Sequence, residues 1–154
     1  MEAKLELAVR SWVLVDASAE WAFDVFTRDV ETWWPCDTHS IRADLGLGRP
    51  EAIVLEPWEG GRFYERTGQS EFGWGTVIAW DPPRRLVLEW HLEADLPPTE
   101  VEVTFTPEDD VTRVELSHTG WEFAGPSGKA ARSRYAGSGG WEPVLRCYAE
   151  VVGA

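Results

Sequence analysis

Residues 99–118 read TEVEVTFTPEDDVTRVELSH, and this stretch decides the fold class. Val101, Val103 and Phe105 alternate with polar residues, and the alternation resumes at Val114 after a Pro-Glu-Asp-Asp turn. Alternation with a period of two predicts strands with one apolar face, and so short a turn joins them as an antiparallel hairpin. Glu100, Glu102 and Glu115 are among the polar positions, so one face of the sheet meets water and the other must be covered.

The same period extends upstream of this hairpin. Turn formers separate the apolar runs without an intervening helical stretch, which indicates an antiparallel meander. The predicted strands lie at 5–15, 51–56, 61–67, 71–80, 85–92, 99–106 and 111–118. In the run at 71–80, four bulky side chains share the parity that we assign to the apolar face: Phe72, Trp74, Ile78 and Trp80.

A C-terminal helix is predicted to cover the apolar face of the sheet. Residues 141–152 return to helical period, with polar residues on the opposite side. The apolar stripe consists of Trp141, Val144, Leu145, Tyr148 and Val152. The fold class is therefore α+β, with a curved antiparallel sheet wrapped around a long C-terminal helix.

The remaining segments predict short helices and one loop. Ser18 is a good N-cap for a helix that follows the first strand, and Pro35 ends a helical stretch at 30–34. Turn formers at 35–50 predict a loop, whereas 127–135 is expected to be helical.

Length and charge limit the class of function. A chain of 154 residues fits a single domain spanning 1–154, and its net charge of −13 disfavours binding to nucleic acid or to an anionic membrane surface. The sequence contains no run of about 18 apolar residues and no signal-like N-terminus, so we expect a cytoplasmic protein. Cys36 and Cys147 are expected to be free thiols.

Ten tryptophans are unusual for a chain of this size. They could fill an aromatic core or line a cavity, and their convergence on the sheet, the C-terminal helix and residues 33–34 favours a cavity. The predicted ligand-binding residues are Trp33, Trp34, Phe63, Glu65, Phe72, Trp74, Ile78, Trp90, Phe105, His118, Trp141, Leu145 and Tyr148.

Several motifs resemble one known family in their order and spacing. They are VDASAE (15–20), TWWP (32–35), GGRFYE (60–65), WGTV (74–77), DPPRRL (81–86), TEVEV (99–103), TRVELSH (112–118) and GWEPVL (140–145). This pattern resembles the branch of the SRPBCC, or START-like, superfamily related to the activator of heat-shock protein 90 ATPase. The resemblance implies the helix-grip fold, also known from birch-pollen allergens, and a chaperone as a partner. The sequence is also similar to the calicheamicin self-sacrifice resistance protein, which implies a hydrophobic or aromatic ligand.

Few residues suggest chemistry. Glu65 shares a strand face with Phe63 and could point into the cavity, and His118 is the best candidate for a polar group at the pocket, as a hydrogen-bond donor or proton shuttle. Cys36 and His39 are close in sequence, but a metal site needs three or four ligands and no second cluster is present. We therefore expect neither a metal nor another cofactor.

Three functions remain open at this stage. We favour a binding protein for a small hydrophobic or aromatic molecule over an enzyme of the polyketide cyclase type, which would use a pocket acid or His118. A chaperone-cofactor-like interaction module is the third hypothesis. An occupied cavity would favour the first, and a flat exposed apolar patch over a filled interior would favour the third. The protein could be a monomer or a homodimer.

Overall fold

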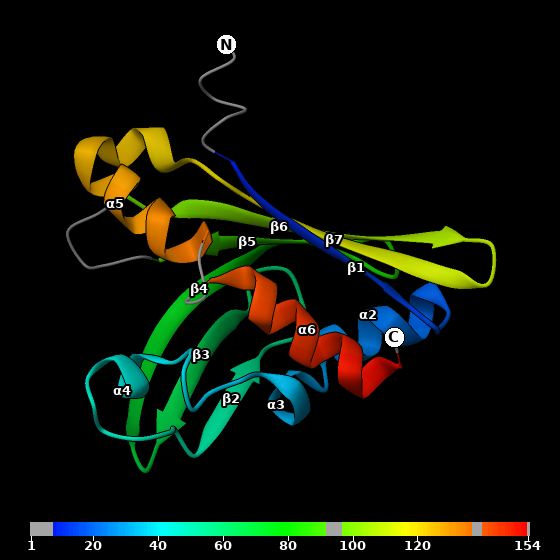
Figure 1. The fold of residues 1–154 in the computed structure, drawn as a ribbon. Helices are drawn as coiled ribbons and strands as arrows, with labels where there is room; N and C mark the ends of the chain where they lie inside the picture. Colours follow the sequence, from blue (N-terminus) through cyan, green and yellow to red (C-terminus); the bar gives the residue numbers. More distant parts are fainter. Residues whose placement is uncertain (1–7, 92–96, 137–139, 154) are drawn as a thin grey trace.

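Seven antiparallel strands form one curved sheet, and helices lie against its concave face (Figure 1). The computed structural model describes residues 8–91, 97–136 and 140–153. The strand order β1-β7-β6-β5-β4-β3-β2 places the first and second strands of the chain at opposite edges. The predicted α+β helix-grip fold is confirmed.

The strands occur close to their predicted positions. They are β1 (Val9–Val15), β2 (Ala52–Leu55), β3 (Arg62–Thr67), β4 (Ser70–Asp81), β5 (Arg85–Trp90), β6 (Thr99–Glu108) and β7 (Val111–Thr119). The predicted N-terminal extension of the first strand to residue 5 lies outside the described residues, as does residue 92. The 99–118 hairpin is formed by β6 and β7 with the expected faces, because Val101, Val103 and Val114 are fully buried.

The helices and the short 3₁₀ turn η1 connect and cover the strands. They are α2 (Ala19–Thr27), α3 (Val30–Trp33), α4 (Ile41–Asp44), η1 (Trp121–Ala124), α5 (Gly125–Ala136) and α6 (Trp141–Val152). Ser18 caps α2 as predicted, because its side chain accepts a hydrogen bond from the Trp21 backbone at 3.1 Å. No helix of the described ranges is long and apolar enough to cross a membrane.

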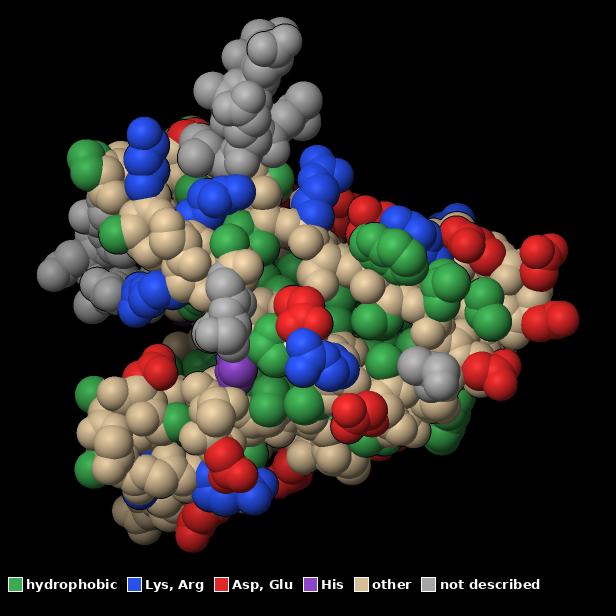
Figure 2. All heavy atoms as spheres, viewed as in Figure 1, with side chains coloured by type: hydrophobic (Ala, Val, Ile, Leu, Met, Phe, Trp, Pro, Cys, Tyr) green, Lys and Arg blue, Asp and Glu red, His purple; other side chains and the backbone are tan. Residues whose placement is uncertain are grey.

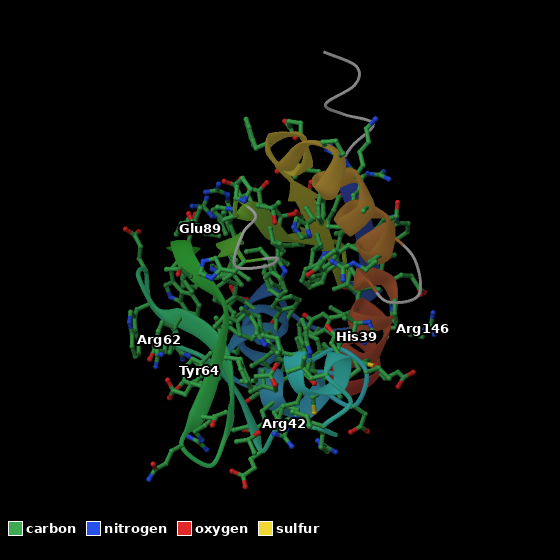
Figure 3. The ribbon with its side chains drawn as sticks, turned by 90° about the vertical axis from the view of Figure 1, so that its left-hand side faces the viewer. His39, Arg42, Arg62, Tyr64, Glu89 and Arg146 are labelled. Atoms are coloured by element: carbon green, nitrogen blue, oxygen red, sulfur yellow. The ribbon has the colours of Figure 1, made fainter. Side chains whose placement is uncertain are left out.

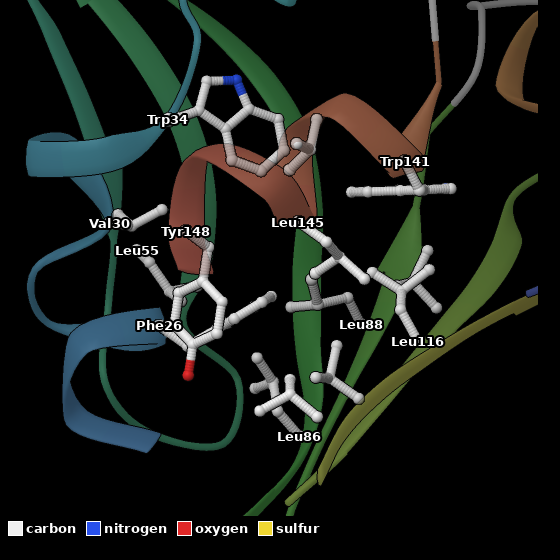
Figure 4. Close-up of a cluster of buried hydrophobic side chains, with 14 of the residues drawn as sticks. Phe26, Val30, Trp34, Leu55, Leu86, Leu88, Leu116, Trp141, Leu145 and Tyr148 are labelled. Carbon is white, nitrogen blue, oxygen red and sulfur yellow. The ribbon is translucent and has the colours of Figure 1, made fainter. Parts of the chain in front are cut away.

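The C-terminal helix α6 buries the predicted stripe against the sheet and α2. Leu145 and Tyr148 are fully buried, and the Tyr148 hydroxyl donates a hydrogen bond to the Ala22 carbonyl at 2.7 Å. Figure 4 shows the aliphatic layer below this helix, which includes Leu86 and Leu88 from β5. Burial of this stripe supplies much of the hydrophobic contribution that holds α6 in place.

The prediction for β4 is wrong at Ile78, which is 44% exposed. The register of β4 against β5 shifts between Val77 and Ala79, so Ile78 is the extra residue of a β-bulge. The bulge interrupts the alternation, and Val77 is buried instead. Trp80 nevertheless reaches the core, where its ring lies 5.0 Å from that of Phe23.

The close approach of β4 to β5 makes Gly75 a testable constraint. A Cβ atom at Gly75 would collide with the backbone oxygen of Glu89, whereas one at Gly73 would meet nothing within 4 Å. We expect Gly75→Ala to lower the free energy of unfolding by about 3 kcal/mol, because the backbone must shift. The matched variant Gly73→Ala should change it by less than about 1 kcal/mol. Urea unfolding of both variants checks this, and equal effects would contradict it.

Candidate functional site

The surface is hollowed between α5 and the segment that carries α4 (Figure 2). When the left-hand side of Figure 1 faces the viewer, α4 lies below the hollow, α5 above it and α6 beside it (Figure 3). The segment containing α4 was predicted to be a loop, because a helix of four residues is too short to show a helical period. Its first turn is held by Ser40, whose hydroxyl accepts from the Ala43 backbone at 3.0 Å.

Five buried aromatic side chains contact one another in a closed circuit. We call Trp34, Phe63, Trp74, Trp90 and Trp141 the aromatic cluster. Ring centroids are 5.0 Å apart for Trp34 and Trp74, 4.9 Å for Trp74 and Phe63, and 5.9 Å for Phe63 and Trp90. Trp141 closes the circuit at 5.0 Å from Trp90 and 6.0 Å from Trp34. The aromatic cluster joins α6, the concave face of the sheet and the segment after α3.

Three other predicted site residues surround Phe26 of α2. Phe26 contacts Trp33 at 5.1 Å, Phe105 at 5.7 Å and Tyr148 at 5.1 Å between ring centroids. This group packs the core beneath α2, and Trp33 joins it to the aromatic cluster, because its ring centroid lies 5.6 Å from that of Trp34. Leu145 is fully buried on α6.

The buried tryptophans use their indole N–H groups within the protein. Trp33 donates to the Val25 carbonyl at 2.8 Å and Trp34 to the His39 carbonyl at 2.7 Å. The other four buried indoles donate as follows: Trp74 to Glu65, Trp90 to the Tyr135 hydroxyl, Trp121 to the His118 carbonyl and Trp141 to the His118 ring. Trp34 and Trp90 keep the largest exposed fractions of the six, 7% and 6%. Within the aromatic cluster, these two side chains are therefore the most accessible to solvent.

Glu65 holds the α4 segment against the sheet. Its fully buried carboxylate accepts from the backbone of Ile41 at 2.6 Å, from that of Arg42 at 3.1 Å and from Trp74 Nε1 at 2.8 Å. Its predicted position on the face of Phe63 is confirmed. Phe72, its register partner on β4, is half-buried. The three donors give Glu65 a structural role at the rim of the aromatic cluster.

His118 lies in the core beneath Trp141. Trp141 Nε1–H donates to His118 Nδ1 at 2.9 Å, so Nδ1 is the acceptor and Nε2 carries the proton. Nε2–H donates to Thr99 Oγ1 at 2.6 Å, and the Thr99 hydroxyl donates to the Trp90 carbonyl at 3.4 Å. Burial lowers the pKa of His118 from 6.5 to about 3. A neutral imidazole with both nitrogens engaged positions Trp141, and this geometry does not suit a proton shuttle.

Three neighbours of the cluster were missed as site residues. Trp121 stacks on His118 with ring centroids 4.1 Å apart, and Tyr135 accepts from Trp90 at 3.0 Å. His39 lies at the edge of the hollow near α6 (Figure 3). These contacts depend on where η1, α5 and the α4 segment dock on the sheet, and no short-range sequence pattern signals that docking.

The described residues contain no group of three or more side chains that could hold a metal ion. Cys36 instead accepts a hydrogen bond from Arg49 Nη2 at 3.2 Å. On the outer face of the sheet, an open depression of about 320 Å³ includes Ile78, Phe123 and the carboxylates of Glu89 and Glu100. That depression is separate from the aromatic cluster and is broadly open to solvent.

Comparisons with known proteins place these observations in context. A family model described as "Activator of Hsp90 ATPase homolog 1-like protein" matches residues 16–152. No curated protein matches the chain. The chain is 32% identical to the anthrahydroquino-gama-pyrone synthase Txn09, solved in complex with SUM, with 94% of this chain and 96% of that chain covered and a TM-score of 0.63.

Two further solved structures share the fold. The self-sacrificing resistance protein CalC from Micromonospora echinospora is 27% identical, with 96% of each chain covered and a TM-score of 0.67. The Aha1 dimer from Colwellia psychrerythraea is 13% identical, with 94% of this chain and 95% of that chain covered and a TM-score of 0.63. At that identity the likeness shows the fold alone.

Proposed function

The chain belongs to the Activator of Hsp90 ATPase homolog 1-like family, and from that premise we propose that it binds a small planar aromatic molecule against the aromatic cluster. The observation that carries this proposal is the closed circuit of five aromatic rings. Two of its members bond to the segments on either side of the hollow, because Trp90 donates to Tyr135 on α5 and Trp34 donates to the His39 carbonyl before α4. Indole faces bind aromatic rings by offset or edge-to-face contact, and they bury large apolar areas. A planar molecule of a few fused rings fits this surface chemistry.

The relatives support a small molecule as the partner. The chain is 32% identical to a synthase named for an anthrahydroquinone pyrone and 27% identical to a resistance protein. The family description also names an activator of a chaperone, Hsp90. A chaperone is therefore the alternative partner. Trp12 and Leu14 on β1 are among the exposed apolar residues available to such a partner.

A binding titration tests the proposal. We expect an anthraquinone to quench tryptophan fluorescence saturably and to release heat in calorimetry, whereas an aliphatic acid of similar mass should not bind. Trp90→Leu should weaken anthraquinone binding about 10-fold, because an aromatic contact contributes about 1 to 1.5 kcal/mol.

The matched control is Trp21→Leu, which removes an indole that is 53% exposed on α2. Its affinity should equal that of the wild type, and circular dichroism should confirm that both variants are folded. Absence of saturable binding, or equal affinities of a folded Trp90→Leu protein and the wild type, would refute the proposal.

A second candidate is a ring-closing enzyme that acts on the bound aromatic molecule. The 32% identity to the synthase Txn09 favours it. Catalysis would require a polar group at the aromatic cluster that the protein itself does not already use. Glu65 and His118 already hydrogen-bond to groups within the protein, so a catalytic acid or base would have to be another residue.

A further inference from the structure

The depression on the outer face of the sheet is a second surface with its own chemistry. Its volume is about 320 Å³, and its lining includes Ile78 of β4, Glu89 of β5, Glu100 of β6, and Glu122 and Phe123 of η1. A small ligand is normally enclosed over most of its surface, whereas this depression is open to solvent. An open depression of this kind is suited to a segment of another protein.

Two exposed apolar side chains meet in this depression. Ile78 is 44% exposed and Phe123 is 69% exposed. The β-bulge turns Ile78 outward while Val77 packs into the core, and bulges are a common means of redirecting a side chain near a functional site. Phe123 lies in η1, which the fully buried ring of Trp121 anchors to the core. Exposed apolar side chains with a polar rim are typical of protein interaction sites.

The rim of the depression is negatively charged. Glu89, Glu100 and Glu122 contribute carboxylates, and the described residues that line the depression include no Lys or Arg. Glu89 and Glu100 are direct partners in the β5–β6 register, and like charges placed opposite each other destabilise a sheet. The nearby His91 ring lies 3.5 Å from Glu89 Oε1, but an imidazole is charged only when it is protonated. A cation bound beside the two carboxylates relieves their repulsion.

We propose that this depression binds a segment of a partner protein in which an apolar side chain is flanked by Lys or Arg. The apolar side chain packs against Ile78 and Phe123, and the basic side chains pair with Glu89 and Glu100. The net charge of −13 also attracts a basic partner from a distance. The aromatic cluster lies on the concave face of the sheet, so this proposal does not depend on the ligand proposed for that cluster.

Selection from a random peptide library displayed on phage tests the proposal without a known partner. The protein should enrich peptides in which an apolar residue is next to Lys or Arg, and calorimetry with a synthetic copy of one such peptide gives the dissociation constant. Phe123→Ser should weaken binding of that peptide about 10-fold, as expected for an aromatic anchor of an interface. Ile78→Ser should also weaken it. Leu47→Ser is the matched control, because Leu47 is 54% exposed outside the depression, and it should leave the dissociation constant unchanged.

Glu100→Gln distinguishes recognition of the peptide from maintenance of the fold. The substitution removes one of the two opposed carboxylates, so it should weaken peptide binding about 3-fold without lowering the urea midpoint of unfolding. Glu59→Gln removes an exposed carboxylate from the turn between β2 and β3, and it should change neither quantity. Added salt should weaken binding to the wild type, because it screens exposed charges.

Three results would overturn the proposal. The first is a selection that enriches no peptide, or only peptides without basic residues. The second is a dissociation constant that is the same for the wild type, Phe123→Ser and Ile78→Ser. The third is displacement of the peptide by spermine with equal efficiency from the wild type and both serine variants, since only the general negative charge would then act. Glu100→Gln gives an independent comparison if a serine variant does not fold.

Discussion

Acidification from about pH 6.5 to about pH 3 is expected to remove about 5 kcal/mol of stability through His118 alone. The imidazole titrates at about 3 in the folded protein, against an ordinary value of 6.5. One pKa unit corresponds to about 1.4 kcal/mol, which gives this magnitude for the full interval. Because native domains are stable by only about 5–15 kcal/mol, a loss of this size is enough to unfold many of them.

The direction follows from proton binding in the two states. Between these two pH values the unfolded chain binds a proton at residue 118, whereas the folded protein keeps the ring neutral. The stabilisation is therefore fully present above about pH 6.5 and declines as the pH falls. His39, whose pKa is also lowered by burial, acts in the same direction.

Urea unfolding between about pH 6.5 and 4.5 measures this effect, because carboxylates with ordinary pKa values stay mostly ionised there. The wild type should lose about 2–3 kcal/mol over this interval, and His118→Gln should lose much less. His91→Gln is the matched control, because His91 is exposed beside Glu89, and it should keep the wild-type slope. A wild-type stability that is flat across the interval would contradict the prediction.

Glu65→Ala is expected to lower the free energy of unfolding by about 4 kcal/mol. The substitution leaves the backbone N–H groups of Ile41 and Arg42 and the indole N–H of Trp74 without their acceptor. Each unsatisfied buried donor costs about 1–3 kcal/mol, and water entering the site offsets part of the sum. The α4 segment should also detach from β3, since two of the three lost bonds hold it there.

Two other variants make this prediction specific. Glu65→Gln keeps the shape but places an amide N–H₂ group near donors, so its effect should be intermediate. Glu71→Ala removes a half-exposed carboxylate that pairs with Arg62 at 3.0 Å, and it should cost less than about 1 kcal/mol. Unfolding experiments and hydrogen exchange at Ile41 and Arg42 measure both effects. If Glu65→Ala resembles Glu71→Ala, the carboxylate does not hold the segment.

The parts of the fold that were predictable have a regular period. The α6 stripe and the β6–β7 hairpin follow from spacing alone, because the side chains of a helix or strand repeat at fixed intervals. Ile78 was misassigned because a bulge adds one residue, and a single residue reverses the face of everything near it. The spacing of apolar residues in the sequence does not show where a bulge adds a residue to a strand.

The sequence indicated which residue types form the candidate site, but it indicated only part of how these residues are arranged in space. Trp74, Trp90 and Trp141 were correctly expected to converge, because each lies on a periodic element. Trp33 contacts Trp34 of the aromatic cluster and also packs against Phe26 and Tyr148 beneath α2. The position of His39 depends on hydrogen bonds between its segment and residues elsewhere in the chain, so it could be recognised only once the segment was placed.

The internal hydrogen bonds of the six buried indoles also decide what kind of ring they can attract. An indole whose N–H is already committed within the protein offers a partner only its electron-rich face and the edges of its carbon atoms. The face of an indole is the negative side of its quadrupole, so it attracts ring systems whose own faces are depleted of electrons. Under the proposed function we therefore expect the aromatic cluster to bind quinone-like rings more tightly than rings enriched in electrons.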